Sequence, residues 1–212
     1  MRRVLAVLVL GLAAASPAAP PPDCTTATGV AKLLCADPTL AGLDRSMAEV
    51  LPEARAAALP GERERLDEQQ RAFVERRDAC LTHDDPPACV AFAYELRLAE
   101  LRIRYGLVQA FGSETWECGD GSLVLVASYG EAGGPGGAGR GGGPARPGPA
   151  RAAPPAPTVA LTRGDRKVVA VLRPSEHGVR YEAEGAIAFW VRDAEATVRW
   201  AGKQLTCTRA GR

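Results

Sequence analysis

Six cysteines constrain this chain of 212 residues more than any other feature of its sequence. An even number of cysteines is typical of exported proteins, because an oxidising compartment lets them pair. Four of the six lie early and two lie late, which predicts two small domains that are each stapled by disulfides. The early set is Cys24, Cys35, Cys80 and Cys89, and the late set is Cys118 and Cys207.

The N-terminus predicts export. Arg2 and Arg3 precede an apolar run over residues 4–15, the layout of a secretory signal, which we place at residues 1–19. The run is too short to span a bilayer. Two prolines and an aspartate precede Cys24 where a lipoprotein signal has small residues, so we predict no lipidation. The mature protein is therefore expected to be periplasmic or secreted, with no membrane span.

Charge and residue chemistry exclude several function classes. The 26 basic and 25 acidic residues are nearly balanced, which argues against nucleic acid as a partner. The sequence shows no nucleophile beside a base, no acid pair on a defined element and no cluster of metal ligands. We therefore predict a protein that is not an enzyme, with no catalytic residues, no metal and no cofactor.

Residues 24–106 predict a helical domain. Apolar residues at helical spacing favour three helices, over 44–58, 62–81 and 88–104, with Asp44 capping the first. Breaks at Leu59-Pro60-Gly61 and at residues 84–87 separate them. The first domain is thus expected to be a disulfide-stapled three-helix unit.

Four cysteines in this domain allow three disulfide pairings. Antiparallel packing of the first two helices brings Cys35 near Cys80, because the start of one helix then lies near the end of the other. We therefore favour the bond Cys35–Cys80 together with Cys24–Cys89.

Residues 111–210 predict an all-β domain, so the chain as a whole is α+β. Eight short strand candidates at hairpin spacing favour a small antiparallel barrel, whose closure removes exposed strand edges. A Cys118–Cys207 bond would join the first strand to the last and add several kcal/mol in the chain-entropy model. The candidates are residues 115–118, 122–129, 158–162, 167–173, 179–184, 187–192, 196–200 and 204–209.

One segment interrupts this domain. Residues 131–157 are rich in Gly and Pro and poor in apolar side chains, so they cannot support a core. We expect a disordered insertion between the second and third strands.

The segment Ser175 to Asp193 holds the candidate binding residues. Residues 179–184 and 187–192 read as a hairpin around Gly185-Ala186, which makes the numbers of opposed residues sum to about 371. His177 and Arg192 then fall at the same open end, within about two positions of facing one another. Two such donors at the rim of a rigid sheet suit the recognition of carboxylates.

The pattern Ser-x-x-Gly-x-x-Tyr followed by Phe-Trp resembles the MliC-like family of inhibitors of C-type lysozyme. In that family a Ser before the Gly and a Lys two residues after the Trp enter the lysozyme cleft; His177 and Arg192 stand at these positions, and Asp193 replaces a Gly. The resemblance implies a monomer that binds a C-type lysozyme. The implied lysozyme-binding residues are His177, Arg192, Ser175, Gly178, Arg180 and Tyr181.

The first domain resembles the N-terminal domain of LprI-like lysozyme inhibitors. The resemblance rests on the cysteine spacing and on Arg77-Asp78-x-Cys80, and it implies a location in the cell envelope. Four residues are interpreted as structural, since carboxylates cap helices and arginines tie them together: Asp37, Asp44, Arg77 and Asp78. An alternative function is a non-inhibitory envelope adaptor or structural protein that retains the two folds.

Overall fold

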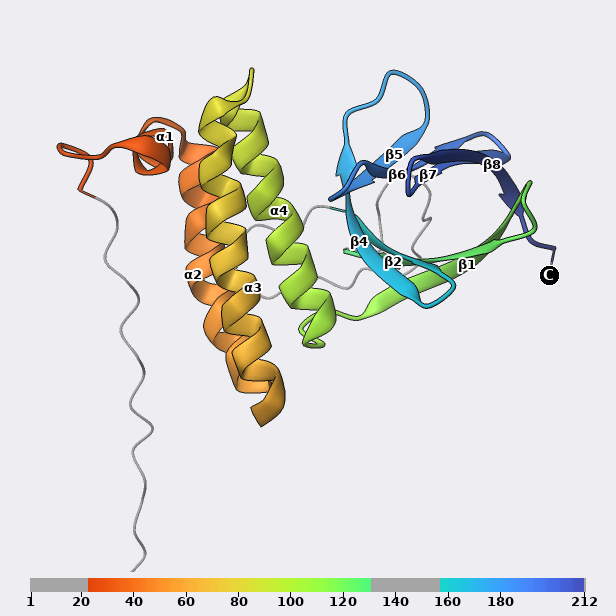
Figure 1. The fold of residues 1–212 in the computed structure, drawn as a ribbon, viewed down its shortest axis with the longest axis horizontal. Helices are drawn as coiled ribbons and strands as arrows, with labels where there is room; N and C mark the ends of the chain where they lie inside the picture. The colour runs from red at the N-terminus through yellow and green to blue at the C-terminus, as the bar shows by residue number, and fades with distance from the viewer. Residues whose placement is uncertain (1–22, 131–156, 212) are drawn as a thin grey trace, which may run out of the picture.

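The computed structural model describes residues 23–130 and 157–211, which form a helical region and a β-barrel side by side (Figure 1). The predicted signal peptide lies outside the described residues, as does the predicted insertion apart from Pro157. No helix in the described ranges combines the length and apolar character that crossing a membrane requires.

The described part of the helical region contains four α-helices, where the sequence predicted three. The additional helix α1 is short, and α2 begins earlier than predicted because Asp37, and not Asp44, caps it by accepting from the backbone N–H of Thr39 (2.7 Å). A proline opens each of the three long helices, where its missing N–H costs nothing. The bounds are α1 Gly29–Ala36, α2 Pro38–Ala57, α3 Pro60–Ala79 and α4 Pro86–Arg104, with a 3-10 turn at Cys80–Thr82.

A buried tyrosine joins the three long helices. Tyr94 of α4 donates its hydroxyl hydrogen to Asp44 of α2 (2.7 Å) and accepts from the guanidinium of Arg77 of α3 (3.0 Å). Burial raises the pKa of Tyr94, and the bond to Asp44 raises it further. Arg77 also binds Asp78. These contacts confirm a structural role for Asp44 and Arg77, which join α2 and α3 to α4 through Tyr94, while Asp78 binds the Arg77 guanidinium within α3.

The disulfide pairing predicted for the helical region is wrong. Cys24 bonds to Cys35 and Cys80 bonds to Cys89, with Cα atoms 5.7 and 5.5 Å apart. The prediction assumed that the packing of two long helices brings cysteines together. Instead α1 and the 3-10 turn after α3 fold the chain back within 11 and 9 residues, so each bond closes a short loop.

The second region is the predicted closed antiparallel barrel of eight strands, each paired with its neighbour in the sequence and the last with the first. The predicted bond Cys118–Cys207 is confirmed, because the two residues face each other across β1 and β8. Trp116 and Phe189 meet edge to face in the barrel core, with ring centres 5.6 Å apart. The strands are β1 Ala110–Cys118, β2 Leu123–Tyr129, β3 Thr158–Arg163, β4 Arg166–Arg173, β5 Val179–Ala183, β6 Ile187–Arg192, β7 Glu195–Trp200 and β8 Lys203–Arg209.

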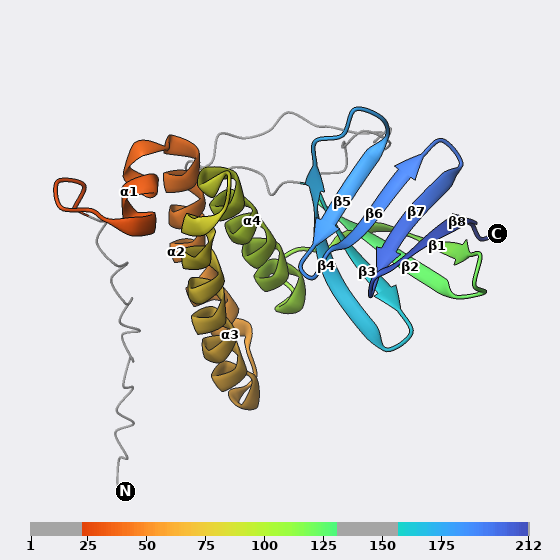
Figure 2. The same ribbon diagram turned by 45° about the horizontal axis from the view of Figure 1, so that its top comes forward.

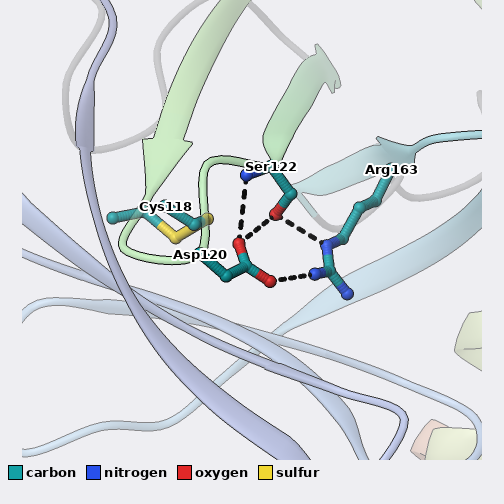
Figure 3. Close-up of a disulfide and its surroundings, with 5 residues drawn as sticks. Cys118, Asp120, Ser122 and Arg163 are labelled. Carbon is teal, nitrogen blue, oxygen red and sulfur yellow. Dashed lines mark hydrogen bonds and ion pairs between the residues drawn. A yellow bond between two sulfur atoms is a disulfide. The ribbon is translucent and has the colours of Figure 1, made fainter.

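The turn beside this disulfide is tied to a neighbouring hairpin (Figure 3). Asp120 accepts from the hydroxyl of Ser122 (2.6 Å), from the backbone N–H of Ser122 (3.1 Å) and from the guanidinium of Arg163 (2.6 Å). These bonds, led by those from Ser122, lower the pKa of Asp120. The turn between β1 and β2 is thereby linked to the end of β3.

Helix α4 packs against the outside of β4 (Figure 2). The guanidinium of Arg173, at the end of β4, pairs with Glu95 and lies 4.5 Å over the ring of Phe92. A second ion pair, Arg76–Glu184 at 3.1 Å, links α3 to the turn after β5. The apolar part of the interface contains Leu96, Ala99, Val171, Phe92 and Val169.

Candidate functional site

His177 and Arg192 lie at the same end of the barrel, as predicted. His177 is in the loop of residues 174–178, which projects from the barrel between β4 and β5 (Figure 1), and Arg192 ends β6. Pairs such as Val179 with Val191 sum to 370, one less than predicted, because the β5–β6 turn has three residues and not two. We call the loop 174–178 together with Arg192 and Asp193 the rim.

Trp190 organises the rim. Its indole N–H donates to the backbone carbonyl of His177 (2.6 Å), and its ring lies under the guanidinium of Arg192 (4.3 Å). One half-buried aromatic residue thus positions the backbone of His177 and the side chain of Arg192. A guanidinium stacked on an indole ring is attracted by its π face and needs no carboxylate partner.

Gly178 is required by the shape of the rim. Its φ of +75° lies in the left-handed region, and a Cβ at this position would stand 2.1 Å from the carbonyl oxygen of Val191. The same Cβ would be 2.9 Å from Cγ of Arg192. Only glycine lets the loop lie directly on the end of β6, so Gly178 determines how close His177 comes to Arg192.

Ser175 supports the loop from within. Its hydroxyl donates to the carbonyl of His177 (2.8 Å), the same oxygen that accepts from Trp190. The backbone of the loop is therefore fixed, while the His177 side chain is exposed. The sequence alone assigned Trp190 no role in supporting this loop. The signal for such a role is the spacing of Trp190 and Arg192, which are two residues apart and so share a face of β6.

Arg180 and Tyr181 lie on opposite faces of β5. Arg180 pairs with Glu182, and its guanidinium is 5.8 Å from the centre of the Trp190 ring. The half-buried Tyr181 packs against the barrel core, and this burial raises its pKa, with a smaller contribution from the charge of Glu114. The structure therefore places Arg180 beside the rim and turns the Tyr181 ring inward.

The rim carries acidic side chains as well as cations. Glu176 and Asp193 are exposed and directly adjoin His177 and Arg192 in the sequence. Asp193 has a φ of +54°, a conformation that favours glycine. Within the described ranges no group of three or more His, Cys, Asp or Glu residues could hold a metal ion. The geometry fits contact with another molecule's charged groups.

Comparison with known proteins agrees with this geometry. Residues 150–206, which include the rim, match the family described as membrane-bound lysozyme-inhibitor of c-type lysozyme, MliC. The chain is also 28% identical to the lipoprotein LprI of Mycobacterium bovis and of Mycobacterium tuberculosis, over 97% of this chain and 98% of the relative. An LprI-like helical region precedes an MliC-like barrel. Comparison with solved structures found no match.

The resemblance supports a lysozyme-inhibitor family, whose partner is a protein, and a location in the envelope or outside the cell. The relatives are named lipoproteins. In this chain the sulfur of Cys24 is bonded to that of Cys35, so it is not available for a thioether to a lipid.

Proposed function

We propose that this protein is a periplasmic or secreted inhibitor of a C-type lysozyme that acts as a monomer. The rim enters the active-site cleft, where His177 and Arg192 donate hydrogen bonds to the catalytic carboxyl groups. The observation that carries the proposal is the contact of Trp190 with both the His177 backbone and the Arg192 guanidinium.

The chemistry of the target suits these two donors. A retaining glycosidase presents two carboxyl groups about 5 Å apart, flanking the bond that it cleaves. Arg192 offers several N–H donors in a planar fork, which matches a carboxylate, and the imidazole of His177 offers one or two. Because the loop backbone at His177 is fixed by two hydrogen bonds and the Arg192 side chain is held on the Trp190 ring, these groups lose little conformational freedom on binding.

The helical region supports the base of the same loop. Arg173 precedes Ser175 by two residues, and its pairing with Glu95 and stacking on Phe92 fix it to α4. The rim is therefore joined on one side to the barrel through Trp190 and on the other to the helices through Arg173. We propose that the helical region restrains the loop and that the barrel supplies the contacts.

The test is a lysozyme rate assay with wild-type protein and the double variant His177→Ala/Arg192→Ala. Chicken-type, goose-type and invertebrate-type lysozymes would be compared. We expect the double variant to lose inhibition of a chicken-type enzyme by at least about 100-fold, since a truncated interfacial charge typically costs 2 kcal/mol or more. Lys203→Ala is the matched control, because Lys203 is exposed beside the β7–β8 turn at the opposite end of the barrel.

Two results would contradict the proposal. Equal inhibition by wild type and the double variant would exclude the rim as the inhibitory surface. No inhibition of any lysozyme class by wild-type protein would favour the alternative, an envelope adaptor or structural protein.

A further inference from the structure

A second candidate site lies between the helical region and the barrel. An open cavity of about 640 Å³ is lined by α4 and Gln69 of α3 on one side, and by β4, the end of β5 and the start of β6 on the other. Helix α4 and strand β4 lie side by side in Figure 2. This volume is within the range of about 300–1,000 Å³ typical of small-molecule sites, which occur preferentially between domains.

The cavity is separate from the rim. Strand β4 begins at the cavity with Arg166 and Lys167 and ends with Arg173, after which the rim loop starts. The turn after β5, at Glu184 and Gly185, also borders the cavity, whereas β5 begins beside the rim. The two sites therefore lie toward opposite ends of the same strands.

One wall contains an ion pair between a buried arginine and a half-buried glutamate. Arg97 is only 3% exposed, and it donates to Glu100 (3.2 Å) and to Gln70 (3.2 Å). Burial raises the pKa of Glu100 and lowers the pKa of Arg97. A partly buried ion pair is a weak source of stability, and its place in a cavity wall makes it a candidate for ligand contact.

Other polar groups in the cavity have no partner in the described part of the chain. The hydroxyl of Tyr105 is buried without a hydrogen bond there. Arg104 and Lys167 are exposed and make no hydrogen bond or ion pair with a described side chain. A buried hydroxyl is normally bonded, so its isolation beside two unpaired cations points to a missing acceptor.

The excess of cationic side chains indicates that the missing hydrogen-bond acceptor is an anion. Four cationic residues line the cavity, against the two carboxylates of Glu100 and Glu184. Each carboxylate already pairs with an arginine, Glu100 with Arg97 and Glu184 with Arg76. The cationic residues are Arg97, Arg104, Arg166 and Lys167.

We infer that this cavity binds a small ligand that carries a carboxylate on a partly apolar body. Arg104, Lys167 and the Tyr105 hydroxyl would hold the carboxylate, and Ile103 and Val168 would contact the body. A glycopeptide fragment of the bacterial cell wall fits, because it carries a free carboxylate together with the methyl groups of its lactyl, acetyl and alanyl parts. The choice of that fragment rests on the proposed function, because cell-wall glycan is what a lysozyme cleaves.

The test measures binding directly, by calorimetry on the full exported chain without any lysozyme. The probe is muramyl dipeptide, compared with its neutral amide. We expect saturable binding of the acid, weakened about tenfold by Lys167→Gln or Arg104→Gln, since a hydrogen bond to a charged group contributes about 1.5 kcal/mol or more. Ile103→Trp, which fills the cavity, should abolish binding. Lys203→Gln is the control and should bind as wild type does.

The inference is overturned if wild type shows no saturable binding, if Lys167→Gln and Arg104→Gln bind as wild type does, or if the neutral amide binds equally well. Competition by inorganic phosphate at equal concentration would overturn the glycopeptide assignment and leave a simple anion site. The cavity variants should keep lysozyme inhibition, whereas the rim double variant should keep binding of the probe. Failure of one site is therefore distinguishable from failure of the other.

Discussion

The disulfides of the two regions differ in the length of chain that each one closes. In the helical region each disulfide closes a loop of 11 or 9 residues and holds a local turn. In the barrel one disulfide spans 89 residues and joins the first strand to the last. The helices are held mainly by their apolar core and by Tyr94, whereas the closure of the barrel, and with it the rim, is secured by one long-range bond.

The largest difference between the two regions is expected when a disulfide is removed from each. In the chain-entropy model the 89-residue loop of Cys118–Cys207 stabilises by about 4.6 kcal/mol, against about 3 kcal/mol for each short loop. We expect Cys118→Ser/Cys207→Ser to unfold the barrel at a much lower temperature and to abolish inhibition. Cys24→Ser/Cys35→Ser should lower stability less and leave inhibition measurable. Calorimetric unfolding and the rate assay check both, and an equal loss from the two variants would contradict the comparison.

Two glycines that flank β5 provide the next test, because only one of them belongs to the rim. Gly178 and Gly185 both have positive φ, but a Cβ on Gly178 would meet a backbone carbonyl, whereas one on Gly185 would meet nothing within 4 Å. We expect Gly178→Ala to cost about 3 kcal/mol in unfolding free energy and to remove inhibition. Gly185→Ala should cost about 1 kcal/mol through backbone strain alone and keep inhibition. Equal effects would show that the close approach of the loop to β6 is unimportant.

A smaller and opposite effect is expected at Asp193. Its positive φ favours glycine, and its carboxylate adjoins Arg192 in the sequence and would face an acidic target. We expect Asp193→Gly to stabilise the protein by about 1 kcal/mol and to strengthen inhibition about fivefold. Asp193→Asn removes the charge without relieving the backbone, so it should strengthen inhibition without the gain in stability. Weaker inhibition by both variants would mean that the carboxylate itself contacts the target.

The smallest effect concerns pH and the turn beside the barrel disulfide. The pKa of Asp120 is lowered by its hydrogen bonds, so the stability it contributes is present above its ordinary pKa of 3.8 and is lost as the pH falls through the folded value. We expect Asp120→Asn to lower the Tm slightly at pH 7 and to match wild type once the pH is below the folded-state pKa of Asp120. Asp165→Asn, in the β3–β4 turn, should match wild type at both pH values. A Tm difference for Asp120→Asn that persists in acid would contradict the assignment.

The barrel could be predicted from the sequence because each strand pairs with the next strand along the chain. Hairpin turns at Gly119–Gly121, Gly164 and Gly202 separate strands of alternating character, so strand order, closure and the Cys118–Cys207 bond all follow from neighbour pairing. The location of His177 and Arg192 at one end of the barrel was predictable for the same reason. The error of one residue in register arose at the β5–β6 turn, since a two-residue and a three-residue loop look alike when glycine and alanine follow one another.

The helical region could be predicted only in part because its disulfides depend on short elements. Helix α1 has eight residues and the turn after α3 has three, too few for a periodic pattern to reveal. Without them, the four early cysteines were assigned by the packing of long helices, which gave the wrong pairs. At the site, the role of Trp190 was missed because a tryptophan in a strand usually indicates core packing.

The central claim is that Arg192 meets a catalytic carboxylate of the lysozyme, and a double-mutant cycle tests it most directly. Binding would be measured for Arg192→Ala, for a lysozyme with one catalytic carboxylate changed to its amide, and for the two together. We predict a coupling energy of at least about 1.5 kcal/mol, as found for close charge pairs across interfaces. A coupling energy below about 0.5 kcal/mol with each catalytic carboxylate would mean that the two effects simply add, and it would contradict the claim.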